Sequence, residues 1–128
     1  RDKKQGEVSL KAAIDAVNAF CDAWGEYPYD TLDVVQTPYN AGGMEYPGLV
    51  RIAEMYADLI GAEGDESLRL DVAHEVAHEW FYAVVGNDQY REAWLDESFA
   101  VYGEFVYQLY TGESETDVQA RVDSLTAA

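Results

Sequence analysis

The residues best suited to chemistry lie in the stretch 71–81, which contains His74-Glu75-Val76-Ala77-His78. Two histidines four positions apart lie only about 40° apart around a helix and one turn along it. Their imidazole nitrogens can therefore converge on one metal ion, with Glu75 beside them. Motifs this short also arise by chance, so the five residues alone leave a metal site and an ordinary polar helix face as open alternatives.

A third ligand favours the metal site. A catalytic zinc usually has three protein ligands and one open position. Glu97, within Trp-Leu-Asp-Glu, supplies a carboxylate from a second predicted helix. His74 and His78 are also the only two histidines in the chain, and both fall inside the motif, unlike scattered structural histidines.

The elements that must position these residues begin with helices and short strands. Apolar residues at three- and four-residue steps predict a packing helix over 8–24, whose stripe includes Leu10 and Ile14. Strands are predicted at 31–37 and 49–53. The turn-rich stretch 39–48 between them indicates either a hairpin turn or a binding loop.

The second half of the chain is predicted to be helical. Residues 62–67 form a polar loop, the histidine helix covers about 68–85, and a further helix covers about 93–110 before Gly112. Ser114-x-x-Asp117 resembles a capping box for a final helix. The packing stripe of the 93–110 helix is predicted to be Leu95, Phe99, Tyr102, Val106 and Leu109.

The length indicates one domain at most, and the helices and strands predicted above make its class α+β. We divide its 128 residues into a packing helix (1–26), a sheet segment (27–60), the ligand helices (65–112) and a C-terminal helix (113–128). The 25 acidic and 8 basic residues give a formal net charge of −17, which argues against nucleic acid and anionic membrane surfaces as partners. The charge favours cations such as metal ions and amines, or serves solubility alone.

Other features set limits on class and context. Cys21 is the only cysteine, so no disulfide forms within the chain and the compartment stays open. No segment approaches the roughly 18 continuous apolar residues of a membrane span. The chain begins at Arg1 without a methionine, so we expect it to be part of a longer protein.

These motifs resemble the gluzincin aminopeptidases, the family of the alanyl and leucyl aminopeptidases and leukotriene hydrolase. His-Glu-x-x-His is followed after eighteen residues by Glu97, and Gly43-Met44-Glu45 resembles the family's Gly-x-Met-Glu-Asn motif. The matching region covers residues 27–104. The resemblance implies a thermolysin-like zincin catalytic domain, in which a small mixed sheet carries the Gly-Met-Glu segment at its edge and packs against the ligand helices.

The resemblance also implies a metal centre and its chemistry. His74, His78 and Glu97 correspond to the ligands of one zinc ion. Glu75 corresponds to the general base, which takes a proton from the attacking water and passes it to the leaving amine.

A substrate site follows from the same resemblance. Glu45 corresponds to the residue that binds the free α-amine of a peptide substrate. The backbone of Gly42, Gly43 and Met44 corresponds to the strand that runs alongside that peptide. The partners implied are therefore a peptide with a free N-terminus and the rest of a parent polypeptide, with an N-terminal β domain and a C-terminal helical domain.

The sequence departs from the family pattern at three places. Tyr46 and Asp96 stand where asparagine is usual; Asp96 either strengthens metal binding or faces solvent. The family's oxyanion-stabilising tyrosine has no match, because Tyr102, Tyr107 and Tyr110 are predicted to be packing residues. We therefore expect weak or no activity from this segment alone. A thermolysin-like endopeptidase, a metal-retaining binding module and an acidic interaction domain with a chance motif are the alternatives.

Overall fold

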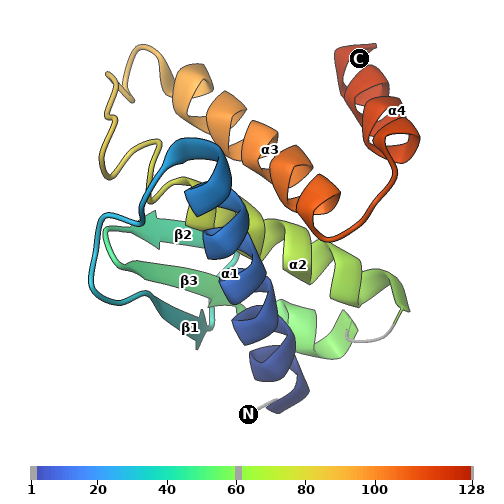
Figure 1. The fold of residues 1–128 in the computed structure, drawn as a ribbon. Helices are drawn as coiled ribbons and strands as arrows, with labels where there is room; N and C mark the ends of the chain where they lie inside the picture. The colour runs from blue at the N-terminus through green and yellow to red at the C-terminus, as the bar shows by residue number, and fades with distance from the viewer. Residues whose placement is uncertain (1–2, 60–61, 128) are drawn as a thin grey trace.

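The structure is a computed structural model that describes residues 3–59 and 62–127, so the predicted segment boundary at residue 60 and the chain ends at 1–2 and 128 lie outside it. The described chain is mixed α+β, as predicted (Figure 1). Its elements, in order, are α1 (Lys3–Trp24), β1 (Asp33–Thr37), β2 (Gly43–Tyr46), β3 (Leu49–Ala53), the 3-10 helix η1 (Glu54–Leu59), α2 (Ala62–Ala77), α3 (Ala93–Tyr110) and α4 (Glu115–Thr126).

The three strands form one small sheet in the order β1-β3-β2. β1 runs parallel to β3, whereas β2 pairs with it in the antiparallel direction. The β2–β3 connection is a hairpin, one of the two alternatives for the stretch 39–48, but its first strand lies inside that predicted turn. The hairpin turns at Gly48, whose φ of 75° suits glycine. β2 is therefore an edge strand of the described sheet.

Helices α1, α2 and α3 pack against one another, and α2 also lies against β2 and β3 (Figure 1). Small residues allow the close approach of these helices. A Cβ added at Gly103 of α3 would lie 2.6 Å from the Cβ of Ala77, nearer than real carbon atoms approach. The core between the elements is continuous and includes Phe20, Ile52, Leu68, Val72, Val76 and Trp80.

α1 buries only part of the predicted stripe. Leu10 and Ile14 are 60% and 53% exposed, whereas Phe20, at the same three- and four-residue spacing, is fully buried. Ala12 and Ala16 are also fully buried. Their small side chains let α1 pack closely against its neighbours, so Leu10 and Ile14 lie on the outer face.

Most of the predicted packing stripe of α3 is wrong, although Val106 packs against the core as predicted. Phe99, Tyr102 and Leu109 are exposed, and the buried face instead includes Asp96, Glu104 and Gln108 together with Ala100, Gly103 and Tyr107. Polar side chains occupy this inner face because they contact groups of α2 and α4, as described below. A search for apolar periodicity therefore selects the wrong side.

α2 occupies a different range from the predicted helix. It includes the predicted loop at 62–67 and ends at Ala77 rather than near residue 85. Tyr82 adopts a φ of 130°, which is incompatible with a continuing helix. The indole of Trp80 donates a hydrogen bond to the carbonyl of Gly25 (3.1 Å), and Val85 N–H donates back to Trp80 O (2.9 Å). Contacts with α1 therefore end the helix early.

The predicted C-terminal ends of α1 and α3 are confirmed, although α1 begins at Lys3 rather than at residue 8. Gly25 and Gly112 follow α1 and α3 with positive φ angles of 104° and 97°. Ser114 caps α4, because its hydroxyl accepts a hydrogen bond from Asp117 N–H (3.1 Å). None of the described helices has the length and apolar character needed to cross a membrane.

Candidate metal centre

The three predicted ligand residues come from two consecutive helices. His74 and Glu75 lie in the last turn of α2, and His78 is the first residue after it. The chain continues in a helical turn there, because Glu79 N–H donates to Val76 O (3.1 Å). His78 therefore keeps its place one turn beyond His74, and Glu97 reaches the pair from the second turn of α3.

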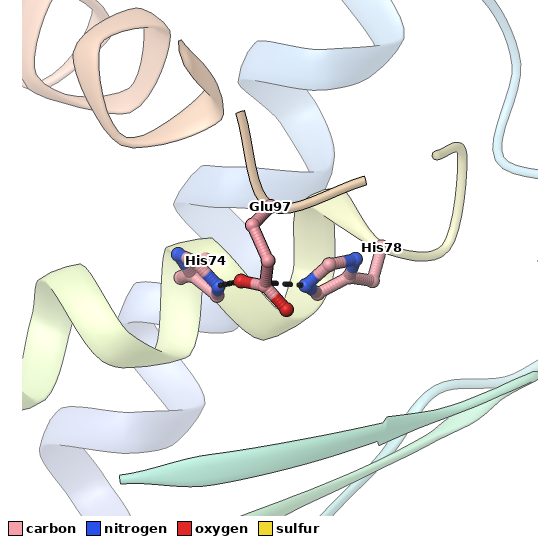
Figure 2. Close-up of side chains that lie close together, drawn as sticks. All are labelled: His74, His78 and Glu97. Atoms are coloured by element: carbon pink, nitrogen blue, oxygen red, sulfur yellow. Dashed lines mark hydrogen bonds and ion pairs between the residues drawn. The ribbon is translucent and has the colours of Figure 1, made fainter. Parts of the chain in front are cut away.

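The ligand atoms of the three side chains converge. Figure 2 shows the Glu97 carboxylate directed between the two imidazole rings. Glu97 Oε2 lies 3.1 Å from His74 Nε2 and 4.0 Å from His78 Nε2. One ligand atom from each residue lies within 4.8 Å of the other two, so the group could hold a metal ion. The structure thus brings together the residues that the spacing selected.

Hydrogen bonds on the far side of each ring fix which nitrogen faces the cluster. His74 Nδ1 lies 2.9 Å from Glu104 Oε1, and His78 Nδ1 lies 3.0 Å from Asp96 Oδ1 and 3.1 Å from the carbonyl of Phe81. Ionised carboxylates and carbonyls only accept hydrogen bonds, so both Nδ1 atoms carry a proton. Each Nε2 is the nitrogen left for a ligand, an arrangement that recurs at metal-binding histidines.

Charges around the cluster shift the pKa values of its groups. Burial lowers the pKa of His74, but its hydrogen bond to Glu104 and the charges of Glu104, Glu75 and Glu97 raise it to about 9 overall. Without a metal, His74 is therefore protonated at neutral pH and forms ion pairs with the carboxylates of Glu97 and Glu104. A metal ion has to displace its Nε2 proton, which makes metal binding dependent on pH.

Glu75 has the properties of a proton acceptor. Burial raises its pKa to about 8; the charge of His74 lowers it, whereas Glu45, Asp71 and Glu97 raise it. Its Oε2 atom is buried and has no hydrogen-bond partner within the described residues. A buried carboxylate oxygen without a partner is costly, so this atom is suited to meet a group that enters the site.

The cluster of His74, His78 and Glu97 opens into a cleft of about 450 Å³ between α2, α3 and the edge strand β2. Two glycines allow β2 to pass close to α2. A Cβ added at Gly43 would lie 2.5 Å from Glu75 Cδ, and one at Gly42 would overlap the carboxylate of Asp71. Met44 and Glu45 continue the same wall of the cleft. All eight predicted site residues therefore line one cleft.

Glu45 lies near the metal cluster from the β2 side. One of its carboxylate oxygens lies within 4.8 Å of ligand atoms of His78 and Asp96. Gly42 faces Asp71 and Gly43 faces Glu75, so residues 42–45 pass α2 in chain order. The wall of the cleft formed by residues 42–45 thus begins beside Asp71 and ends at Glu45.

Sequence reasoning missed part of the site. Asp96 does not face solvent: it is 6% exposed, contacts His78, and accepts a hydrogen bond from Gln89 Nε2 (2.7 Å). Glu104 was not singled out at all. Its position seven residues after Glu97 puts it on the same face of α3 two turns on, and that spacing is the signal that could have found it.

Comparisons with known proteins identify the family of this chain. The family model described as the peptidase family M1 domain matches residues 9–127. Aminopeptidase M1-B of Oryza sativa subsp. japonica is 36% identical over 102 residues, which is 75% of this chain and 12% of the relative.

Two further relatives are similar to the same extent. Aminopeptidase 2 of Candida albicans is 37% identical over 103 residues (76% of this chain, 11% of the relative), and aminopeptidase N of Rattus norvegicus is 32% identical over 111 residues (82% and 12%). The chain thus spans about 12% of the length of these relatives. The match of the family model over residues 9–127 shows that this chain belongs to peptidase family M1.

Proposed function

We propose that the chain is the zinc-binding catalytic core of an aminopeptidase, with the thermolysin-like zincin fold. The carrying observation is the convergence of His74, His78 and Glu97 within 4.8 Å, beside the buried unpartnered oxygen of Glu75. Two imidazole nitrogens and one carboxylate are a ligand set that suits zinc and leaves a coordination position open. Membership of peptidase family M1 supports the same assignment.

Each residue then has a defined chemical task. A zinc ion held by the three ligands supplies a Lewis acid, which activates water and polarises the carbonyl of the scissile peptide bond. Glu75 accepts a proton from the attacking water and donates it to the leaving amine. A pKa of about 8 supports this role, because a group that titrates near neutral pH can both accept and donate the proton.

The β2 edge is proposed to bind the peptide. Glu45 pairs with the free α-amine, and the backbone of residues 42–44 forms strand-like hydrogen bonds with the peptide. The position of Glu45 within 4.8 Å of His78 supports this arrangement. An amine held that close to the metal centre directs cleavage to the N-terminal end of the substrate.

The rest of the active site is proposed to come from a longer parent polypeptide. Tyr102, Tyr107 and Tyr110 of α3 do not line the described cleft, so none is placed to stabilise an oxyanion there. We propose that an N-terminal β domain and a C-terminal helical domain complete the site. We expect the isolated chain to hydrolyse peptides weakly or not at all.

Peptide hydrolysis tests this function. We would assay two proteins, the zinc-loaded chain and the longer polypeptide proposed to contain it. The substrate is an alanyl peptide with either a free or an acetylated N-terminus. The longer polypeptide is expected to cleave only the free peptide, and Glu75→Gln should lower its rate by roughly 10²–10⁴-fold. Equal cleavage of the acetylated peptide would identify an endopeptidase instead. Zinc binding by the longer polypeptide without cleavage of either peptide would identify a binding module.

A further inference from the structure

The C-terminal helix α4 reaches the metal centre through one side chain. The Arg121 guanidinium extends from α4 to α3, where Nη2 forms a short ion pair with Glu104 Oε2 and Nη1 donates to Gln108 Oε1 (2.6 Å). Its Cζ also lies 5.3 Å from the centre of the Phe105 ring. Three contacts thus fix the orientation of this guanidinium.

Glu104 connects Arg121 to the histidine. Its two oxygens have different partners: Oε2 pairs with Arg121, and Oε1 accepts the Nδ1 proton of His74. Glu104 is 8% exposed, so solvent offers little replacement for either partner. The result is a continuous series of contacts from α4 through Glu104 to the ring of His74, whose Nε2 faces Glu97.

The charges nearby explain why Glu104 requires a cation. The cleft is also lined by Glu45, Asp71, Glu75 and Glu97, and the charge of Glu104 acts on Asp71. Without Arg121, only the His74 ring, among the described partners of Glu104, would offset the repulsion by these groups, and the Glu104 carboxylate could rotate away from it. The planar guanidinium fork can hold Glu104 and Gln108 at once, which the single ammonium of lysine does less well.

From these contacts we infer that Arg121 is a positioning residue of the candidate metal centre, acting through Glu104 to hold the His74 ring with Nε2 directed at Glu97. The inference rests on the proposed zinc site and adds a role for α4 in it. The positioning role and the charge of Arg121 predict opposite effects on zinc affinity. Removal of a nearby positive charge should by itself tighten the binding of a cation, whereas loss of positioning weakens it.

Zinc affinity in a double-mutant cycle tests the inference. Dissociation constants are measured by chelator competition for the native chain, Arg121→Gln, Glu104→Gln and the double variant. Groups that orient metal ligands typically contribute 10–100-fold in affinity, so we expect roughly tenfold weaker binding in Arg121→Gln. The double variant should bind no more weakly than Glu104→Gln alone, because Arg121 acts through Glu104. Arg121→Lys should restore part of the loss.

Two controls separate positioning from general effects. Arg91→Gln removes an exposed positive charge in the loop before α3 and should leave the affinity unchanged. Val118→Ala loosens the buried contact of α4 without touching Glu104. Tighter or unchanged zinc binding in Arg121→Gln, additive losses in the double variant, or an equal loss in Val118→Ala would each overturn the inference.

A second readout does not require bound zinc. In the metal-free chain, NMR should detect a protected His74 Nδ1 proton that is lost in Arg121→Gln and retained in Arg91→Gln. If the native chain bound no zinc, the proposed function would fail, and this proton would still decide the role of Arg121. Retention of the proton in Arg121→Gln would contradict that role.

Discussion

At the scale of single residues, the contact between β2 and α2 controls whether the cleft can form. Gly43 passes so close to Glu75 that no larger residue fits without displacing the strand or the carboxylate. The sequence showed two glycines in a turn-rich stretch, but only the structure shows which groups oppose them. Gly43 is therefore required because the backbone of β2 lies close to Glu75, and not because its φ angle is unusual.

Gly43→Ala should therefore destabilise the fold. The added Cβ would lie 2.5 Å from Cδ and Cγ of Glu75, and overpacking of this kind typically costs about 1–3 kcal/mol. Urea unfolding followed by circular dichroism measures the change. Gly6→Ala is the matched control: nothing lies within 4 Å of its added Cβ, and alanine in a helix interior is favoured by roughly 0.5–1 kcal/mol. Equal stability of Gly43→Ala and the native chain would refute the close contact.

At the scale of elements, turn and cap signals were read correctly from the sequence, whereas both ends of α2 were not. The hairpin at Gly48 and the Ser114 cap depend on a few neighbouring residues, so their patterns sufficed. The end of α2 at Ala77 depends on Trp80 meeting α1 across 55 residues, which no local pattern contains. The inner face of α3 is polar because it supports the histidines, so its burial does not follow hydrophobicity.

Tyr107 on this inner face of α3 gives the fold a dependence on alkaline pH. Burial raises the pKa of Tyr107 from 10.0 to about 12; Arg69 lowers it, and Asp15 and Glu113 raise it. Because the folded pKa lies above the unfolded one, the stabilising contribution is complete below pH 10 and is lost as pH rises from 10 to 12. A shift of this size corresponds to about 2–3 kcal/mol.

The free energy of unfolding measured between pH 9 and 12 checks this dependence. Tyr107→Phe should lose less stability over that range than the native chain, because phenylalanine cannot ionise. Tyr90→Phe should follow the native curve, since the Tyr90 side chain is 96% exposed. Identical curves for Tyr107→Phe and the native chain would show that another group is responsible.

At the scale of the whole molecule, the acidic composition has a partial explanation in the structure. Carboxylates gather around the cleft, where Glu45, Glu75, Glu97 and Glu104 surround two histidines. Such a concentration of negative charge favours a cation at its centre. The grouping of His74, His78 and Glu97 was predicted from their spacing and the family resemblance, because two motifs on adjacent helices contain them. Glu104 could have been found from its spacing to Glu97, whereas the contacts of Asp96 and Arg121 depend on how the elements pack, which a single sequence does not show.

The measurement that tests the central claim most directly is the zinc content of the purified chain by elemental analysis. The native chain and Glu75→Gln should each bind one zinc ion, because Glu75 is a proposed base rather than a ligand. His78→Ala should bind none after the same reconstitution and desalting, since two ligands hold zinc too weakly. An equal zinc content in His78→Ala and the native chain, or no zinc in the native chain, would contradict the assignment of His74, His78 and Glu97 as a zinc site.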